Sequence, residues 1–433
     1  MVALAGAACV RPRVPDPASV SLAVRERTGA EDGAVAAAAA WLQDGLDQGE
    51  AVALALARNL DFQADLAELG VSAAAVSEVA QLRNPALTLL LPWGPKQLEA
   101  TARWPIDALW LRPRRVAAAR LDAEAVAARL VANGLELAAV ARSAWADAAL
   151  AEERAPLVEE TVAARQRIAE IAEERMKIGE VSAFETGLAR DDRARSLEDA
   201  ARQKAQREVA RQRLGSLIGF PEGDFALGRA AASGVCVDTP TLLTDARAAR
   251  PELRAAELTV EAAAQRAGLT RLEALGLTVV VDANAKGSQG FEAGPGFDVN
   301  VPLFHLGGAA RQRALAELAR ARARLVALTQ QVDREVREAR TRVVEAEAVL
   351  AAWDMVVKER EATLAAARAR FDTGEEPLLV VLESQRQLAD ARLRRADVRA
   401  ERLRAQARLA RVVGHETACP VATSERIGGG GGA

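Results

Sequence analysis

The sequence has few of the side chains on which enzyme chemistry usually depends. It contains only two histidines, His305 and His415, and three cysteines whose spacing matches no metal-ligand motif. No Ser/His/Asp grouping can be assembled and no Walker loop is present, while residues 287–290 (GSQG) are typical of a hairpin turn. We therefore predict that the protein is not an enzyme and has no cofactor and no metal site.

Aromatic side chains and long apolar runs are also scarce. Aromatic residues account for 3% of the 433 residues. The longest apolar run, residues 34–42, is far shorter than the roughly 18–20 residues of a membrane-spanning helix. The 57 basic and 60 acidic residues give a net charge of −3, which argues against a nucleic-acid partner. The abundance of Ala, Arg and Glu instead predicts long packed helices.

The N-terminus is similar to the end of a signal peptide. Residues 1–9 (MVALAGAAC) are small and apolar, and Ala7 and Ala8 precede Cys9 as they would at a lipoprotein cleavage site. Lipidation of Cys9 is one expectation, and an uncleaved Ala-rich start is the other. We assign residues 1–16 to the signal remnant, 17–40 to a linker and 415–433 to a disordered tail.

The chain contains an internal repeat. Residues 175–179 (RMKIG) align with 370–374 (RFDTG), and the helical ends 217–219 and 412–414 align at the same offset of 195 residues. Such a constant offset predicts two halves of the same construction.

Each half is predicted to contain a helix, a pair of strands and a long helical hairpin. The halves cover residues 41–219 and 245–414, with a connector at 220–244. The strand pairs are expected at 86–107 and 276–303, and the hairpins at 114–219 and 309–414.

The hairpin helices carry a coiled-coil pattern. In the second half, apolar residues recur every seven positions from Leu325, and a second series interleaves from Thr329, as in an a/d seam. Because no Gly or Pro occurs between Arg311 and Phe371, we predict one helix of about 60 residues there. Its counterpart contains Pro156, where we expect a kink or a break.

Polar and apolar residues alternate along the predicted strands. Asp282, Asn284, Asp298 and Asn300 alternate with Val, Ala and Phe residues, so one face is polar and the other apolar. The pattern suits a barrel in which these four residues face a wet lumen, and equally a soluble half-buried sheet. Four strands are too few to close a barrel and would leave open edges, so several copies that each donate four strands would satisfy both constraints.

The order of these elements resembles the outer-membrane efflux factor family, which includes TolC. The resemblance covers residues 41–415, and the Arg-Pro-Glu-Leu helix opening leans towards the heavy-metal, Czc-type branch. The matching stretches are 51–59 (AVALALARN), 83–87 (RNPAL), 250–256 (RPELRAA), 301–308 (VPLFHLGG) and the Gly374 turn followed by 378–383 (LLVVLE).

The resemblance implies a mainly α protein with a small β part, in which long coiled-coil hairpins in a two-fold repeat carry four β-strands per protomer. Three protomers would form a 12-stranded β-barrel in outer-membrane lipid and a periplasmic α-helical tunnel. Such a homotrimer is a passive duct for small molecules or metal ions, and its partners are a periplasmic adaptor and an inner-membrane RND-type pump. The alternative is a periplasmic coiled-coil adaptor or scaffold, but adaptors carry a single hairpin.

The resemblance also assigns roles to single residues. The adaptor and pump would contact the turns at Gly179 and Gly374. At the tunnel entrance, Glu383 matches an acidic position of the family, whereas Val380 stands where a second acid is expected. Glu185 is the repeat equivalent of Val380 and could supply that charge.

Two cysteines come after the ends of equivalent helices. Cys236 comes after Gly219, and Cys419 comes after Gly414. The family wraps such segments as a belt around the tunnel, so the two thiols either form a disulfide between the halves or remain unpaired.

Overall fold

The computed structural model describes residues 14–91, 98–221, 225–228, 233–235, 238–270, 276–285, 290–300, 307–416 and 418–420. The chain divides into two compact units. Unit 1 comprises Met1–Leu22, Ala64–Ala132 and Pro251–Gln331, and unit 2 comprises Ala23–Gln63, Asn133–Arg250 and Val332–Ala433.

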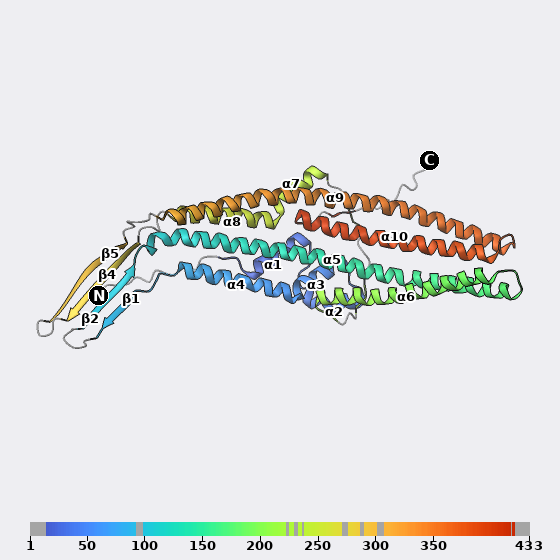
Figure 1. The fold of residues 1–433 in the computed structure, drawn as a ribbon, viewed down its shortest axis with the longest axis horizontal. Helices are drawn as coiled ribbons and strands as arrows, with labels where there is room; N and C mark the ends of the chain where they lie inside the picture. The colour runs from blue at the N-terminus through green and yellow to red at the C-terminus, as the bar shows by residue number, and fades with distance from the viewer. Residues whose placement is uncertain are drawn as a thin grey trace, which may run out of the picture. The chain divides into compact units, whose positions relative to one another are not determined.

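Unit 1 contains a four-stranded antiparallel sheet (Figure 1). The strands lie in the order β1-β2-β4-β5. They are β1 (Ala86–Leu90), β2 (Glu99–Pro105), β4 (Gly276–Ala285) and β5 (Phe291–Asn300). The register pairs Thr101 with Asp282 and Thr278 with Asp298. Within this sheet, β1 and β5 each pair on one side only, so both present an open edge.

A helix is joined to each strand of the sheet. They are α4 (Leu60–Ala80) before β1, α5 (Ala108–Lys177) after β2, α8 (Pro251–Leu269) before β4 and α9 (Gly308–Asp372) after β5. In unit 1, Arg112 of α5 donates from Nε to the Ala80 carbonyl oxygen at 2.6 Å, and Arg266 of α8 forms an ion pair with Asp122 of α5. These contacts fix α5 between α4 and α8. Among the helices described, none is both long and apolar enough to cross a membrane.

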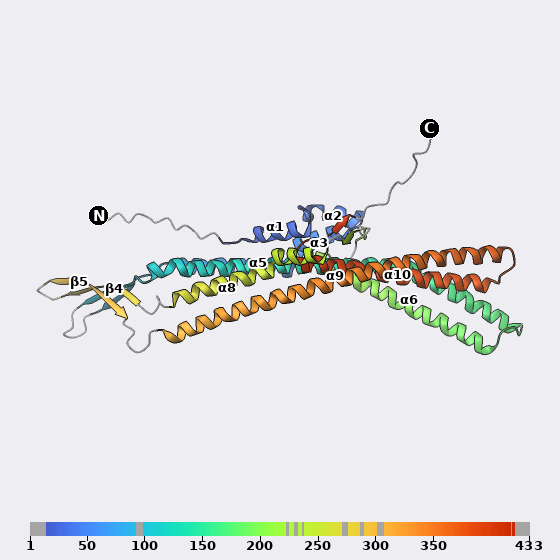
Figure 2. The ribbon, with the colours of Figure 1, turned by 90° about the horizontal axis from the view of Figure 1, so that it is seen from above.

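Unit 2 contains two helical hairpins, which are seen from above in Figure 2. The first pairs the later part of α5 with α6 (Ala183–Ile218), and the second pairs the later part of α9 with α10 (Leu378–Val413). The predicted helix of about 60 residues is confirmed by α9, and its seam residues Val332, Val336 and Val343 are buried. The core between α9 and α10 consists of Val357, Leu364, Ala367, Val381, Leu388 and Ala391.

The two hairpins turn in the same way. Gly179 donates to the Met176 carbonyl at 3.1 Å and Glu180 to the Arg175 carbonyl at 2.9 Å. At the equivalent positions, Gly374 donates to Phe371 and Glu375 to Arg370, both at 2.9 Å. This pair of bonds is a Schellman motif, in which the C′ residue adopts a left-handed conformation. Both glycines have φ of 80°, so the repeat seen in the sequence is also a repeat of backbone geometry.

The predicted linker over residues 17–40 is wrong, because α1 (Pro17–Thr28) and α2 (Ala34–Asp44) lie there. Asp16 and Pro17 are polar and turn-forming residues that also start helices. Asp16 Oδ1 accepts from the Ser19 backbone N–H at 2.8 Å, and Pro17 occupies the first turn, where its missing N–H costs nothing. The chain continues through a capping box at Asp47 and Glu50 into α3 (Gln48–Arg58).

The tail predicted to be disordered from residue 415 is in part ordered. β6 (Ala418–Pro420) pairs with β3 (Ser233–Val235), which precedes α7 (Thr239–Ala249). Glu416 accepts a bond from Arg142, whose side chain is 10% exposed and also donates to the Thr28 carbonyl at 2.9 Å. A buried guanidinium needs such a partner, and this requirement orders the start of the tail. Cys9 and Cys236 lie outside the described residues, so the lipidation and the disulfide stay predictions.

A break at Pro156 is also wrong, because α5 continues from Ala108 to Lys177. Pro156 is exposed, so its ring faces solvent while the buried Ala151 and Val158 hold the helix on either side. Tertiary packing here outweighs the loss of one hydrogen bond.

The Schellman turns yield a first prediction. An added Cβ at Gly374 would meet no atom within 4 Å, so Gly374→Ala is opposed only by the left-handed conformation, at a cost of about 1–2 kcal/mol. We expect faster amide hydrogen exchange around the turn and in the first turn of α10. Gly187→Ala is the control, since Gly187 lies in α6 with equal space and an ordinary φ, and Ala there should slow exchange. Equal effects of the two changes would show that the turn conformation is not strained.

Candidate functional site

The sheet of unit 1 has one apolar and one polar face. Because side chains alternate along a strand and paired residues share a face, the register assigns each residue to a face. The exposed large side chains of the apolar face are Leu87, Leu89, Trp104, Val281, Phe291, Phe297 and Val299. The opposite face carries Glu99, Thr101, Arg103, Asp282, Asn284, Glu292 and Asp298.

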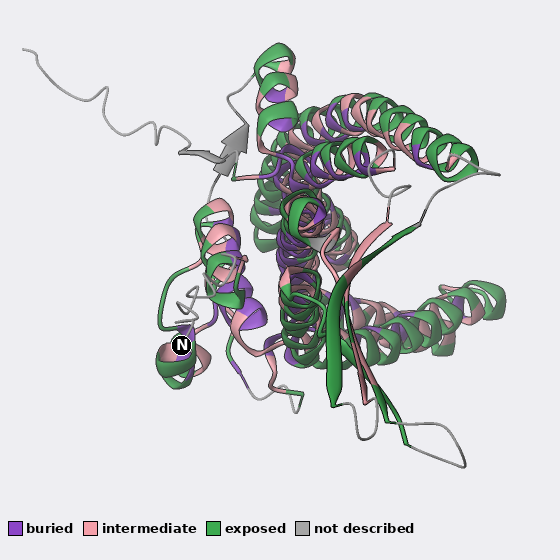
Figure 3. Ribbon diagram, turned by 90° about the vertical axis from the view of Figure 1, so that its left-hand side faces the viewer, coloured by how far each residue is buried: buried purple, intermediate pink, exposed green. Residues whose placement is uncertain are grey.

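The apolar face of the sheet is open in the single chain. Val281 is 45% and Phe297 71% exposed. Figure 3 shows the four strands in green and pink, the colours of exposed and intermediate residues. An apolar surface of this extent is unfavourable in water, so it requires a nonpolar environment or a partner.

The polar face carries one hydrogen bond between strands β2 and β4 and one within β4. Asp282 accepts from Thr101 Oγ1 at 2.7 Å and from Asn284 Nδ2 at 2.9 Å. Asp298 belongs to the same face through its pairing with Thr278, whereas the side chain of Asn300 lies outside what the structure describes. The predicted strand residues Asp282, Asn284 and Asp298 are therefore brought to one surface.

A second group of charges lies on α10, one turn after its start. Arg386 donates to Glu383 from Nε at 2.9 Å and from Nη2 at 2.5 Å, and to Asp390 from Nη1 at 2.8 Å. The hydrogen bond from Arg386, with that from Gln387, holds the pKa of the Glu383 carboxyl below its ordinary value despite partial burial. Two carboxylates share one guanidinium, so this group keeps a negative charge.

Glu185 has a different environment at the tip of the first hairpin. It is the third residue of a capping box in which it accepts from the Ser182 backbone N–H at 2.9 Å, while Ser182 Oγ accepts from the Glu185 N–H at 3.2 Å. These bonds from Ser182 lower the pKa of the Glu185 carboxyl. Glu185 therefore remains ionised at the start of α6, where the helix dipole also favours a negative charge.

Both hairpin tips expose large apolar side chains. Phe184 on α6 is 75% exposed, and its repeat equivalent, Leu379 on α10, is 44% exposed. Ile178 and Phe371 are exposed where the chain enters the two turns. The turns at Gly179 and Gly374 thus present similar exposed apolar side chains, with acidic residues beside them.

Sequence reasoning missed Arg386 and Asp390. Their positions three and seven residues after Glu383 place all three on one side of a helix, a signal that was present in the sequence. The consequence is that Glu383 is one member of an ion-paired group and not an isolated acid.

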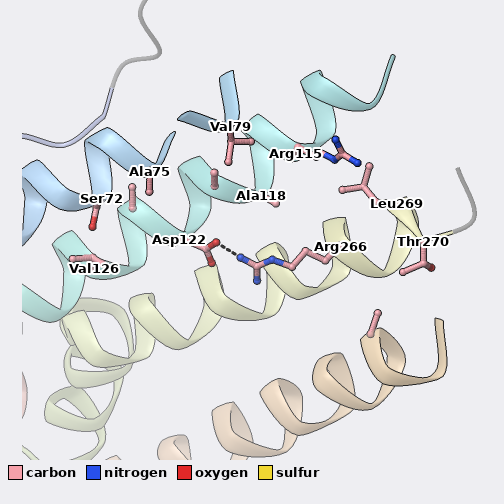
Figure 4. A pocket seen from close by; sticks show the side chains of 13 residues that line it. Ser72, Ala75, Val79, Arg115, Ala118, Asp122, Val126, Arg266, Leu269 and Thr270 are labelled. Carbon is pink, nitrogen blue, oxygen red and sulfur yellow. Dashed lines mark hydrogen bonds and ion pairs between the residues drawn. The ribbon is translucent and has the colours of Figure 1, made fainter. Parts of the chain in front are cut away.

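The described residues also include a pocket of about 520 Å³ in unit 1, between α4, α5, α8 and α9 (Figure 4). Its lining is mostly Ala, Val and Leu, with the Asp122–Arg266 ion pair at its centre. Burial raises the pKa of Asp122 more than Arg266 lowers it. Neither His nor Cys lines this pocket, and no group of His, Cys, Asp or Glu suited to a metal occurs among the described residues.

Solved outer-membrane channels share this fold. CmeC of Campylobacter jejuni aligns with a TM-score of 0.71 and 15% identity, over 86% of this chain and 86% of that chain. VceC of Vibrio cholerae aligns with a TM-score of 0.68 and 18% identity, over 86% of this chain and 96% of that chain. The OprN channel aligns with a TM-score of 0.68 and 19% identity, over 86% of this chain and 90% of that chain. No curated protein matches the sequence. The fold is therefore that of the outer-membrane channel proteins.

The second half of the sequence matches a known family. Residues 242–415 match the family described as outer membrane efflux protein. Within these residues, the resemblance to this family drawn from the short motifs is confirmed, and the fold shared with the solved channels extends over 86% of the chain.

Proposed function

We propose that three copies of this chain form the outer-membrane channel of a tripartite efflux system, a passive exit duct in which no bond is made or broken. The observation that carries the proposal is the four-stranded sheet, with an apolar face, a polar face and two open edges. Open edges are avoided in soluble proteins, and four strands are too few to enclose a lumen. Pairing β5 of one copy with β1 of the next removes every edge and gives a closed sheet of twelve strands.

The two faces fit the two sides of such a sheet. The surface with Val281 and Phe297 would meet outer-membrane lipid, and the surface with Asp282, Asn284, Asp298 and Asn300 would line the aqueous passage. Lipidation of Cys9 would add an anchor in the same membrane.

The hairpin tips are the proposed contact with the other components. The turns at Gly179 and Gly374, with the exposed Phe184 and Leu379 beside them, offer apolar anchors for a periplasmic adaptor, through which an RND-type pump would deliver the cargo. Glu383, grouped with Arg386 and Asp390, and Glu185 are the proposed charges of the tunnel entrance. Export of heavy metals stays a prediction from the sequence.

The proposal is tested on the full-length protein in detergent extracts of separated inner and outer membranes. The channel should be recovered from the outer membrane as a trimer that dissociates into monomers on heating. A monomer released into the periplasm without detergent would favour the alternative, an adaptor or scaffold, and would refute the channel.

The sheet faces yield a second prediction. Arg at a lipid-facing position near the membrane midplane costs about 2–4 kcal/mol, so Val281→Arg should lower the yield of trimer strongly. Asn284→Arg, on the same strand and the opposite face, should leave trimer formation almost unchanged. Both yields are measured by quantitative immunoblotting of unheated membranes. Equal losses in the two variants would contradict the assignment of the faces.

The entrance carboxylates yield a third prediction. Rings of like charge at a constriction set ion preference, so the trimer in a planar bilayer should prefer cations. Because the pKa of both Glu185 and Glu383 lies below the ordinary 4.5, this preference should persist at pH 4.5 and weaken only as the pH falls further.

The reversal potential of a Glu185→Gln, Glu383→Gln double variant should shift towards zero. Glu208→Gln, which changes an exposed carboxylate on α6 away from the turn, is the matched control. An unchanged reversal potential in the double variant would remove both residues from the entrance.

A further inference from the structure

The first part of α9 lacks the packing that the rest of the helix has. Between Gly308 and Gln331 the only buried hydrophobic residue is Ala314, although every residue of this stretch is described. From Val332 onward, buried residues recur at the seam positions. A long helix with one face unburied in the single chain must gain its packing from another surface.

The open side of α9 is both apolar and basic. With about 100° of rotation per residue, one stripe of the helix contains Arg311, Leu315, Ala319, Arg322 and Val326, and all five are exposed. Leu315 is 47% and Val326 59% exposed. Among the described residues, no ion pair forms at Arg311 or Arg322.

The opposite side of α9 faces its own chain. Glu317, Arg320, Ala321 and Arg324 line a cavity of about 330 Å³ together with residues of α8. The exposed stripe therefore points away from α8.

The open side of α4 is both apolar and acidic. Leu66, Leu69 and Val76 are buried, and the opposite stripe runs through Ala64, Val71 and Glu78, with Glu68 beside it. Val71 is 71% exposed. From Ala64 to Ala80, this helix carries acidic side chains and no Lys or Arg.

The sheet topology determines which helices meet when the edges close. α4 leads into β1 and α9 leaves β5, and these two strands are the edges of the sheet. If β5 of one copy pairs with β1 of the next, then α9 of the first copy lies against α4 of the second. The two helices run in opposite directions, since one approaches the sheet and the other leaves it.

We propose that α9 and α4 of neighbouring copies form a charge-paired seam, in which Arg311 meets Glu78, Leu315 meets Val71 and Arg322 meets Glu68. This inference rests on the proposed function, because it uses the closed ring. The open face of α9 and the open face of α4 are each covered by a second copy of this chain. The basic stripe on α9 and the acidic stripe on α4 attract one another and favour this pairing.

The positions along the two helices agree with this pairing. Arg311 lies three residues after the start of α9, and Glu78 lies two before the end of α4. Leu315 lies seven residues after the start of α9, and Val71 lies nine before the end of α4. Arg322 lies fourteen residues after the start of α9, and Glu68 lies twelve before the end of α4. At a rise of 1.5 Å per residue, each pair is level to within about 3 Å.

Cysteine cross-linking tests the position of the seam. In the full-length protein with its three native cysteines replaced by Ser, Val71→Cys with Leu315→Cys should give disulfide-linked dimers and trimers under mild oxidation in membranes. Val71→Cys with Val326→Cys is the matched control. Val326 lies on the same stripe but eleven residues further along α9, or about 16 Å at the helical rise, so it should not cross-link. Equal cross-linking in both, or none in either, would overturn the seam.

Charge reversal tests the attraction. Arg322→Glu alone and Glu68→Arg alone each place like charges opposite one another, and we expect roughly tenfold weaker trimer formation in detergent. The double variant should recover most of the loss. Arg324→Glu, on the side of α9 that faces α8, should not be rescued by Glu68→Arg.

The outcomes separate the two proposals. Trimers that form without the Val71–Leu315 cross-link and without charge rescue would refute the seam and leave the channel standing. If the unmodified protein formed no oligomer, the channel and the seam would both be refuted.

Discussion

The unpaired edges of the sheet are the constraint on which the rest of this structure depends. Every backbone N–H and C=O that leaves water must find a partner, and the outer sides of β1 and β5 have none within the four-stranded sheet of unit 1. The same strands carry an apolar face that is largely exposed. A single copy satisfies neither requirement, and the proposed trimer would satisfy both. The helices joined to the edge strands have the same property, since α4 and the first part of α9 each keep one unburied side.

The internal repeat gives the chain two helical hairpins with the same backbone geometry at their turns. Two equivalent turns, each a Schellman motif with a glycine at φ of 80°, reverse the two hairpins in the same manner. The helix starts after the two turns differ, however. The first hairpin resumes with a capping box on Ser182, whereas the second resumes with Pro377, which makes no side-chain cap bond. The charges differ accordingly, with Glu185 engaged in the cap of α6 and Glu383 paired with Arg386 a turn inside α10. The backbone of the repeat is thus kept while its tips have diverged chemically.

Periodicity in the sequence was sufficient to predict the mainly α fold, the four strands and the α9 helix, because each depends on a local pattern of apolar residues. The failures had a different origin. Asp16 and Pro17 are residue types that occur in linkers and at helix starts alike. Only the hydrogen bond from the Ser19 N–H to Asp16 shows that a helix starts here. Order at Glu416 depends on the buried Arg142, which is 274 residues away. The pairing of Glu383 with Arg386 was within reach of the sequence, since a spacing of three residues on a helix brings two side chains together. Contacts between residues far apart in the sequence could not be predicted in this way.

The alanine-rich packing of unit 2 explains why charges have such a large part in the fold. Where α5 carries Ala141, Ala144 and Ala148, each at most 1% exposed, the small side chains let helices approach closely but fit several registers almost equally well. Large interdigitating side chains normally select one register. Here α5 and α10 are instead joined by a series of ion pairs at matching levels, which are Glu136–Arg411, Asp147–Arg404, Glu153–Arg399 and, with the polarity reversed, Arg154–Asp397.

Each partly exposed pair contributes only about 0–1 kcal/mol, but a shift of either helix by one turn would bring several out of register together. The ion pairs therefore select the register that the alanines permit, and the opposed stripes of α4 and α9 extend the same principle from packing within one copy to packing between copies.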